Sequence, residues 1–320
     1  MSILIIRLSS LGDIILTTPL LQEMRRKYPE ARIDLVVKKE YAGIVSQFPW
    51  LSNIFALDTI KGTEEIQRLN GEFKNAGFDH ILDLHNNFRS NRLRKGLTGK
   101  IHIINKRTFK RWLLVKTKIN LLKDEPDIIG RFFETGKSLG ISDPGTGVTF
   151  EKDFQTSSLK KAALCPGAKH WNKRWPPEYY VEVAKDLIAK GFRIEFFGSA
   201  EENDYVSNIA SQLPQNKITN FCGKLLLAEI PARIAECSLA ITNDSGLMHV
   251  ASAVGIPTIA IFGPTVREFG FMPRNKNVQI VENLNVDCRP CTTIGLDHCP
   301  KGHFRCMKEI MPEIIFTNII

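Results

Sequence analysis

The chain has 320 residues, of which 43% are hydrophobic and 24% are charged, and its formal net charge is +9. This length is comfortable for two domains, and the composition is that of a folded globular protein rather than a disordered one. No run of about 18 apolar residues is present, which excludes a membrane-spanning helix. The first residues lack the layout of a signal peptide, so we expect a cytoplasmic protein.

Short apolar runs alternate with amphipathic patterns in the first half of the chain, as in βαβ units that build a parallel sheet. We expect strands at Ile3–Leu8, Ile33–Val37, Ile54–Leu57, His80–Leu84 and Ile101–Ile104. We expect helices at Thr18–Tyr28, Gly62–Ala76, Ser90–Gly96 and Ile128–Leu139. Pro19 marks either the first turn of a helix capped by Thr18 or a kink in a helix that begins at Asp13.

A second series of the same kind follows Gly140–Leu159, whose turn-forming residues predict a linker. Its strands are expected at Ala162–Cys165, Arg193–Phe197, Ile218–Phe221, Leu239–Thr242 and Thr258–Phe262. Its helices are expected at Pro177–Lys190, Glu201–Gln212, Leu226–Cys237 and Gly246–Val254, and at the tail from Met307 to Ile320. The two series predict domains at 1–155 and 156–320, with ligands bound at the carboxyl ends of the strands.

The positive charge is concentrated in one region. Residues 84–123 contain twelve Lys or Arg and no Asp or Glu. Such a run is either a solvated face or a binding surface for a polyanion, such as nucleic acid, lipid headgroups or a phosphorylated substrate. Apolar side chains including Phe109 and Trp112 alternate with the charges, which favours a membrane interface.

Gly12 and Asp13 follow the first predicted strand, where the chain turns into a helix. For an isolated Asp13 the better interpretation is a helix N-cap, because Asp is favoured there and complements the helix dipole. The sequence contains neither Gly-x-Gly-x-x-Gly nor Gly-Lys-Ser/Thr at this turn. We therefore predict neither the phosphate grip of a dehydrogenase nor a Walker-type loop.

Two loops of the second half contain candidate anion ligands. Lys169, Lys173 and Arg174 follow a predicted strand and form either a diphosphate site or an exposed basic loop. The residues Asn243–Gly246 lead from a buried strand into a helix whose first amides are suited to an anion. His249 lies one turn further, where it would face the same place.

These stretches resemble the ADP-heptose:lipopolysaccharide heptosyltransferases of glycosyltransferase family 9. The resemblance covers nearly the whole chain and is strongest in "RLSSLGDIILTTPLL", "PGAKHWNKRWP" and "NDSGLMHVASAVGIPTIAIFGPT". It implies an α/β protein of GT-B type, two Rossmann-like domains with parallel sheets that face each other across a cleft. The acceptor would bind the N-terminal domain and the nucleotide sugar the C-terminal one. The implied reaction inverts the anomeric configuration and needs neither a metal nor a cofactor beyond the donor substrate, ADP-heptose.

The resemblance also implies roles by position. Asp13 matches the catalytic base, and Lys173 matches the lysine that contacts the donor diphosphate. The other donor-binding positions are Gly167, Ala168, Asp244, Ser245, Gly246 and His249, with Glu201 near the donor ribose. A base opposite a leaving diphosphate is the arrangement that attack by an acceptor hydroxyl requires.

The implied acceptor is an anionic glycolipid, the lipid A-core of lipopolysaccharide. The positions expected to face this acceptor or its membrane are Gly12, Arg89, Arg92, Lys106, Arg107, Lys110 and Arg111. We therefore expect the protein at the cytoplasmic face of the inner membrane, in peripheral contact with it. The final helix, about 307–320, is expected to pack back on the N-terminal domain.

Four of the seven cysteines lie close together in the sequence: Cys288, Cys291, Cys299 and Cys306. The Cys-x2-Cys pair is compatible with zinc, but the second pair is spaced too widely for a common zinc motif. Disulfides are unusual in a cytoplasmic protein. Plain thiols are the leading interpretation, with zinc and disulfides left open, and we expect no metal.

Three other functions stay open on the sequence. The protein could be a family 9 transferase that uses another nucleotide sugar, or a non-catalytic binder of anionic glycolipid. A nucleic-acid binder fits the charge, but no such motif is present, so we expect no nucleic acid partner. The acceptor sugar is also open, the inner Kdo or the first heptose, with a lean to the latter from "PGA…KRWP".

Overall fold

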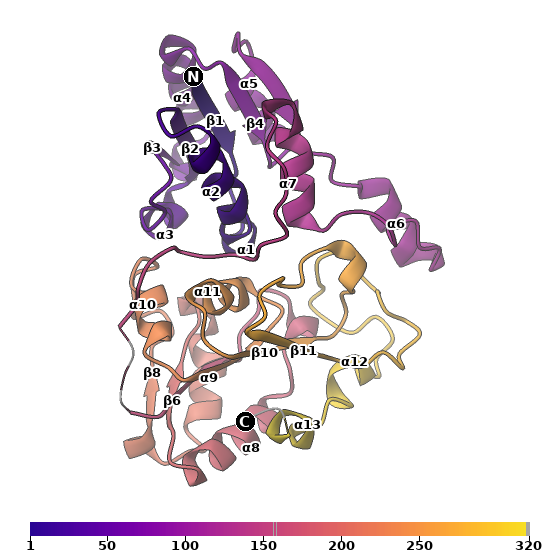
Figure 1. Ribbon diagram of the computed structural model, residues 1–320. Coiled ribbons are helices and arrows are strands. Elements are labelled where there is room, and N and C mark those ends of the chain that lie inside the picture. Colours follow the sequence, from indigo (N-terminus) through magenta and orange to yellow (C-terminus); the bar gives the residue numbers. More distant parts are fainter. Residues whose placement is uncertain (156, 158, 318–320) are drawn as a thin grey trace. The chain divides into compact units, whose positions relative to one another are not determined.

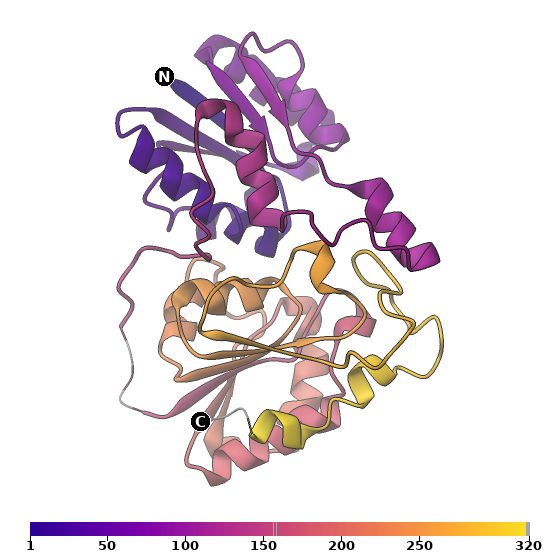
Figure 2. The same ribbon diagram turned by 45° about the vertical axis from the view of Figure 1, so that its right-hand side comes forward.

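A computed structural model of the chain describes residues 1–155, 157 and 159–317 (Figures 1 and 2). It consists of two compact units. Unit 1 comprises Met1–Thr108 and Pro126–Glu151, and unit 2 comprises Phe109–Glu125 and Lys152–Ile320. The sequence predicted a single division after residue 155, whereas the structure assigns residues 109–125 of the first half to unit 2. Residues 156 and 158 of the predicted linker and 318–320 of the predicted final helix lie outside the described residues.

Unit 1 contains a five-stranded parallel sheet in the order β3-β2-β1-β4-β5. The strands are β1 (Ser2–Ile6), β2 (Arg32–Lys38), β3 (Asn53–Leu57), β4 (His80–Asp83) and β5 (Lys100–Ile103). The helices are α1 (Leu11–Ile15), α2 (Thr18–Lys27), α3 (Ala42–Val45), α4 (Gly62–Ala76), α5 (Phe88–Arg94) and α7 (Ile128–Gly136). From Ile3 to Ile6 the central strand β1 is fully buried, as expected of a parallel strand covered on both faces.

Unit 2 contains a six-stranded parallel sheet in the order β11-β10-β9-β6-β7-β8. The strands are β6 (Lys161–Cys165), β7 (Arg193–Phe196), β8 (Ile218–Asn220), β9 (Leu239–Asn243), β10 (Thr258–Phe262) and β11 (Val278–Glu282). The helices are α8 (Pro177–Ala189), α9 (Asn203–Ala210), α10 (Ile230–Ala235), α11 (Gly246–Val254), α12 (Arg305–Lys308) and α13 (Pro312–Phe316). A further helix, α6 (Thr108–Thr117), begins at the last residue of the first segment of unit 1 and continues in unit 2.

The helix boundary near Pro19 differs from both alternatives that the sequence left open. The chain forms two helices, α1 and α2, and the cap of α2 is Thr17 rather than Thr18. The Thr17 hydroxyl donates to the Ile14 carbonyl at 2.7 Å, and Pro19 falls in the first turn of α2. Proline is tolerated there because the amides of a first helical turn have no partner within the helix.

Three other expectations need correction. The predicted helix 226–237 is reduced to α10, because Pro231 belongs in a first turn. The edge strand β11 was not expected, since its sequence VQIVE mixes apolar and charged residues. The described part of the predicted final helix packs on unit 2, since Met307, Ile310 and Ile315 are buried in the core of that unit.

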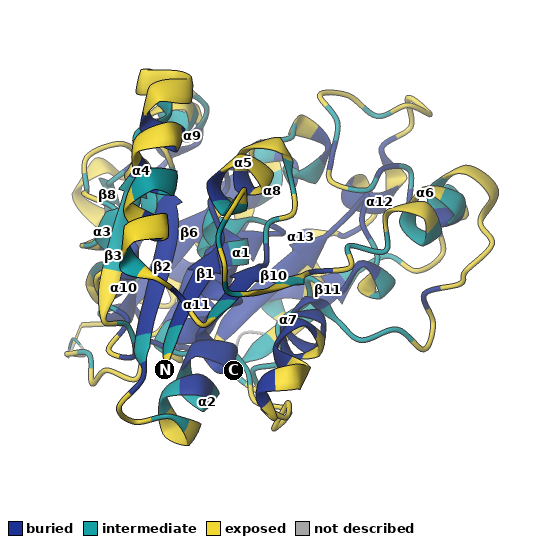
Figure 3. Cartoon of the chain, turned by 90° about the horizontal axis from the view of Figure 1, so that it is seen from above, coloured by how far each residue is buried: buried dark blue, intermediate teal, exposed yellow. Residues whose placement is uncertain are grey.

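The exposure pattern shows that the central strands of each sheet form the interior. In Figure 3 the strands β1, β2 and β10 are mostly buried, whereas α4 carries a long exposed side. Loops at the carboxyl ends of such strands are free to carry functional residues, since the backbone there leaves the sheet.

Candidate functional site

The carboxyl end of β1 presents a buried ion pair in unit 1. Arg7 Nη2 lies 2.5 Å from Asp13 Oδ1, and the Arg7 guanidinium also donates to the carbonyl of Leu84 after β4. Asp13 Oδ2 accepts hydrogen bonds from the Ser10 amide at 3.1 Å and the Ser10 hydroxyl at 2.8 Å. The N-cap of α1 is Ser10 rather than the predicted Asp13. The Asp13 carboxylate completes a capping box with Ser10 and pairs with arginine at the same time, and 17% of its side chain is exposed.

The pKa of Asp13 lies below its ordinary value. Burial on its own would raise this pKa, but the positive charge of Arg7 and the hydrogen bonds from Ser10 outweigh it. Asp13 is therefore ionised at neutral pH, and its carboxylate, which can accept a proton, lies near the carboxyl edge of the sheet. Gly12 is buried beside it in α1.

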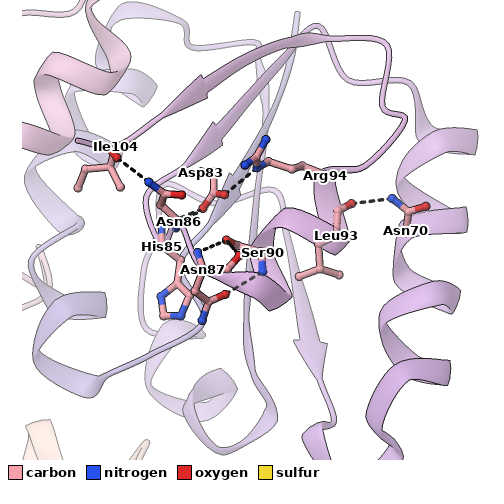
Figure 4. A network of polar contacts seen from close by, with 9 residues as sticks. All are labelled: Asn70, Asp83, His85, Asn86, Asn87, Ser90, Leu93, Arg94 and Ile104. Carbon is pink, nitrogen blue, oxygen red and sulfur yellow. Dashed lines mark hydrogen bonds and ion pairs between the residues drawn. The ribbon is translucent and has the colours of Figure 1, made fainter. Parts of the chain in front are cut away.

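The turn between β4 and α5 lies at the same edge of the sheet (Figure 4). The buried Asp83 carboxylate accepts from the amides of His85 at 3.0 Å and Asn86 at 2.6 Å, and Arg94 Nε donates to it at 2.9 Å. Asn87 and Ser90 form a capping box at the start of α5. These bonds fix the backbone of the turn next to the Leu84 carbonyl that holds Arg7.

The imidazole of His85 points away from Asp83 (Figure 4). Its Nδ1 is buried and has no hydrogen-bond partner among the described residues. Burial and the positive charges of Arg7 and Lys106 lower the pKa of His85 to about 4, so the ring is neutral at physiological pH. Lys106, a member of the predicted acceptor-facing set, is therefore close enough to His85 for its charge to act on the ring.

A pocket of about 440 Å³ opens between the start of α4 and the start of α5. Its lining combines apolar side chains with two exposed cations, Arg89 and Arg92. The Arg92 guanidinium lies 4.3 Å from the centre of the Phe88 ring. Both arginines were predicted to face an acceptor, and the structure places them together in one concave site of unit 1.

Unit 2 presents a second buried ion pair. Lys173 Nζ lies 2.6 Å from Asp244 Oδ2, which also accepts a hydrogen bond from the Thr265 hydroxyl at 2.7 Å. Burial would raise the pKa of Asp244, but Lys173, Thr265 and the nearby His249 lower it below its ordinary value. The structure thus brings together Lys173, Asp244 and His249, which the sequence analysis had placed on two separate loops.

The loop that carries Lys173 is held by Asn243, the last residue of β9. Its side-chain amide donates to the Pro166 carbonyl at 2.7 Å, and its oxygen accepts from the Trp175 amide at 3.1 Å. Asn243 therefore clamps both ends of the loop. Arg174 braces the loop from within by donating to the Ala168 carbonyl at 2.9 Å, whereas Lys169 is exposed.

The start of α11 is suited to an anion. Gly246 is the first residue of this helix, and its cap, Ser245, has a buried hydroxyl without a hydrogen-bond partner among the described residues. The first amides of a helix lack partners within the helix and lie at the positive end of its dipole. His249 is buried one turn further on the same helix.

Two carboxylates, Glu201 and Glu202, follow β7. Glu201 is exposed, and a hydrogen bond from Ser199 lowers its pKa. The neighbouring Glu202 packs against the first loop of unit 2: a Cβ added to Gly167 would come within 2.3 Å of its carboxylate carbon. Gly167 and Ala168 are both buried. Glu202 therefore lies next to the glycine loop, and the role of Glu201 near a donor ribose stays a prediction.

Part of the predicted basic face is engaged within the protein. Arg107 Nη2 lies 3.0 Å from Glu134, and Lys110 forms an ion pair with Glu125. Arg111 donates to the Thr293 carbonyl at 2.7 Å. The run of like charges in the sequence is therefore not a uniform cationic surface in the structure.

The cysteine-rich segment 287–306 supports the Lys173 loop. Asn172 and Leu296 exchange two hydrogen bonds, at 3.1 and 2.8 Å, and Trp171 stacks on Phe304 with ring centres 4.6 Å apart. All seven cysteines are free thiols in the described part of the chain. Within it, no group of three or more His, Cys, Asp or Glu side chains is arranged to hold a metal ion.

Several of these residues were not singled out from the sequence. Arg7, His85, Asn172 and Glu202 position the predicted site residues or lie beside them. Asn243 was already part of the predicted anion-binding turn, but its hydrogen bonds to both ends of the Lys173 loop were not expected. Arg7 bonds to Leu84 and Asn172 bonds to Leu296, and both of these contacts are distant in sequence, so no local pattern marks them.

Residues 66–297 match the sequence profile of glycosyltransferase family 9 (heptosyltransferase), which is more than half of the chain. The chain belongs to glycosyltransferase family 9. This family 9 glycosyltransferase is 26% identical over 296 residues to lipopolysaccharide heptosyltransferase 2 of Escherichia coli K12, with 84% of each chain covered.

Solved structures confirm the GT-B type of fold for this family 9 glycosyltransferase. The E. coli ADP-heptose lps heptosyltransferase II superimposes with a TM-score of 0.79 at 23% identity, over 100% of this chain and 97% of the other. The E. coli heptosyltransferase WaaC with ADP gives a TM-score of 0.76 at 21% identity, over 100% and 99%. In the described residues no helix has the length and apolar character needed to cross a membrane.

Proposed function

We propose that this family 9 glycosyltransferase transfers heptose from ADP-heptose to the inner core of lipopolysaccharide. The observation that carries the proposal is the pair of sites at the carboxyl edges of the two sheets. One holds an ionised, partly exposed carboxylate, and the other holds a lysine beside a helix start with an unpartnered hydroxyl. The heptosyltransferase 2 relative and the ADP-containing heptosyltransferase structure support this choice of substrates.

The proposed reaction is a single displacement. An acceptor hydroxyl oxygen attacks the anomeric carbon of the donor, and its proton passes to Asp13. The bond from that carbon to the diphosphate oxygen breaks, and its electron pair leaves with ADP. Attack from the side opposite the leaving group inverts the anomeric configuration.

Lys173 and the start of α11 stabilise the leaving diphosphate in this proposal, without a metal ion. Lysine supplies a compact charge with three donors, of which one is directed at Asp244. The amides that follow Ser245 and the Ser245 hydroxyl supply neutral donors. Glu202 is our choice for the carboxylate near the donor ribose, in place of Glu201.

The pocket lined by Arg89 and Arg92 is our choice for the anionic groups of the acceptor. Guanidinium groups bind carboxylates and phosphates through paired hydrogen bonds, and both groups abound on a lipopolysaccharide core. The lipid portion of such an acceptor lies in a membrane. We therefore propose that the enzyme acts in the cytoplasm, as a peripheral protein at the inner membrane.

The proposal is tested with Asp13→Asn, which keeps the size of the side chain and removes the base. Loss of a general base lowers turnover by about 100-fold or more. We expect this loss in heptose transfer from ADP-heptose to truncated lipopolysaccharide acceptors, measured by mass spectrometry of the product. Binding of ADP-heptose, measured by calorimetry, should stay unchanged, because the donor-binding residues lie in unit 2.

Asp79→Asn is the matched control, since Asp79 bonds to Ser2 at the opposite end of the sheet. It should retain full transfer activity. Near-normal turnover of the Asp13→Asn variant would remove Asp13 from the mechanism. If the unaltered enzyme transferred another sugar in preference to heptose, the proposed donor would be wrong.

A further inference from the structure

The segment Phe109–Glu125 interrupts the sequence of unit 1 and packs within unit 2. We call it the inserted segment. Its inner side is apolar: Leu114 and Leu122 are buried against Phe269, which is fully buried itself. This small cluster anchors both α6 and the residues that follow it.

Polar contacts fix the inner side further. The Arg111 guanidinium lies 5.0 Å from the centre of the Phe269 ring and donates to Thr293. Lys118 Nζ donates to the carbonyls of Cys288 at 2.8 Å and Pro290 at 2.6 Å. Because Arg111 and Lys118 are hydrogen-bonded to backbone carbonyls of the same protein, we do not include them in a binding surface.

The outer side of the inserted segment has the opposite character. Phe109 and Trp112 are 67% and 50% exposed, and their rings stack with centres 6.0 Å apart. Ile119 and Leu121 are 53% and 48% exposed. Two lysines of the same segment, Lys116 and Lys123, are also exposed, as is Asp124. Figure 3 shows α6 with exposed and intermediate residues along most of its length.

Exposed aromatic and aliphatic side chains next to lysines are typical of surfaces that lie in a membrane interface. Aromatic rings favour the boundary between headgroups and acyl chains, and lysine ammonium groups bind lipid phosphates. The anchored inner side presents these side chains on a rigid support, so little ordering is needed on binding. A solvated face would not need four exposed apolar side chains within 13 residues.

We propose that the outer side of the inserted segment inserts into the interface of an anionic lipid bilayer. Phe109 and Trp112 enter the bilayer surface, and Lys116 and Lys123 contact lipid phosphates. The inference rests on the proposed function in one respect, because a membrane-embedded acceptor gives the contact its purpose. It assigns the membrane contact to unit 2, whereas the sequence analysis had spread it over residues 84–123.

The test is binding of the full-length protein to vesicles of phosphatidylethanolamine and phosphatidylglycerol, measured by co-sedimentation. The Phe109→Ser/Trp112→Ser double variant should bind at least about tenfold more weakly, given the apolar area that the two rings contribute. Leu284→Ser is the matched control, because Leu284 is 78% exposed in unit 2 outside the inserted segment. The control should bind as the unaltered protein does.

A second variant guards against a folding defect. Lys116→Glu/Lys123→Glu changes only exposed side chains, and it should weaken vesicle binding and reduce its dependence on salt. Unchanged binding of both double variants would overturn the inference. So would a stable dimer of the unaltered protein that the Phe109/Trp112 variant loses while vesicle binding persists, since a second copy would then cover this face.

Transfer assays separate this inference from the proposed function. With a delipidated, water-soluble acceptor, the Phe109/Trp112 variant should match the unaltered enzyme. With the same acceptor glycolipid in vesicles, its rate should fall at least about fivefold, in line with weaker partitioning. If neither the unaltered enzyme nor the variant transferred heptose to either acceptor, the proposed function would be wrong. The vesicle-binding measurements would still show whether the inserted segment binds the bilayer.

Discussion

Each unit contains a buried ion pair between a cation and an aspartate. The two pairs differ in which partner the surrounding protein holds more firmly. In unit 1 the cation is the immobilised partner: Arg7 is buried and also bonded to Leu84, and it holds Asp13. In unit 2 the carboxylate is immobilised: Asp244 is buried and also bonded to Thr265, and it holds Lys173. In each pair the partner that we assign to the reaction is the one whose side chain is more exposed, Asp13 in unit 1 and Lys173 in unit 2.

A buried ion pair can therefore serve two purposes. It keeps a carboxylate ready to act as a base in unit 1, and it keeps a lysine ready to bind a diphosphate in unit 2. A fixed arginine lowers the pKa of the carboxylate and keeps it ionised. A fixed aspartate keeps a flexible ammonium group in place until a diphosphate competes for it. The comparison therefore predicts different consequences when the two pairs are broken.

The largest effect is expected for Lys173→Met. The variant removes a charge that acts on the leaving group, and loss of one such donor lowers turnover by about 100-fold to 1,000-fold. Affinity for ADP should also fall, in contrast to Asp13→Asn. Steady-state kinetics and calorimetry with ADP measure both. Lys169→Met, in the same loop but exposed, should change turnover by less than about threefold; equal losses in the two variants would show that the loop acts through bulk charge alone.

A smaller effect on rate, with a shift in pH dependence, is expected for Arg7→Met. Without the Arg7 charge, burial raises the pKa of Asp13. A base works only when deprotonated, so the decline of kcat/KM on the acid side should move to higher pH. Because the pKa of Asp13 is lowered in the native protein, its contribution to stability is present above the unfolded-state pKa and is lost as pH falls through the folded-state value.

Arg32→Met is the control for this pH profile, since Arg32 pairs at 2.7 Å with the buried Asp34 on β2. Its acid limb should coincide with that of the unaltered enzyme. A coincident acid limb for Arg7→Met would show that a group other than Asp13 governs the profile.

The smallest effect on turnover is expected for Asn243→Ala, which should instead lower the free energy of unfolding. The variant leaves the buried Trp175 amide and Pro166 carbonyl without their partner, at a cost of about 1–3 kcal/mol in the free energy of unfolding. Urea denaturation measures this cost. Asn208→Ala, at an exposed position on α9, should stay within about 0.5 kcal/mol. A similar small change for Asn243→Ala would mean that the loop is held by its other contacts.

The sequence predicted much of the fold because buried parallel strands are continuous apolar runs. The stretch from Ile3 to Ile6 and the strands around Ala162–Cys165 and Thr258–Phe262 are examples. The edge strand β11 escaped prediction because an edge position tolerates charged residues. The helix α6 escaped because its packing partners, such as Phe269, are more than 140 residues away in the sequence.

The places of the candidate site residues were predictable where the sequence pattern is local, and their roles stay predictions. Asp13, Lys173 and Asp244 stand in distinctive stretches, and the structure shows each in the segment that follows a strand. The sequence did not predict that Glu202 lies against Gly167, because adjacent residues at the start of a helix point in different directions. The contact of Asn172 with Leu296 joins loops 124 residues apart, so only the folded chain reveals it.

The inserted segment has a consequence for genetic dissection of this protein. The chain passes from one unit to the other after Thr108, after Glu125 and after Glu151. A fragment that begins at Lys152 would lack Leu114 and Leu122 and would leave Phe269 uncovered. Neither half is therefore an independent module in the gene, and domain exchange between relatives should carry residues 109–125 together with the carboxyl-terminal half.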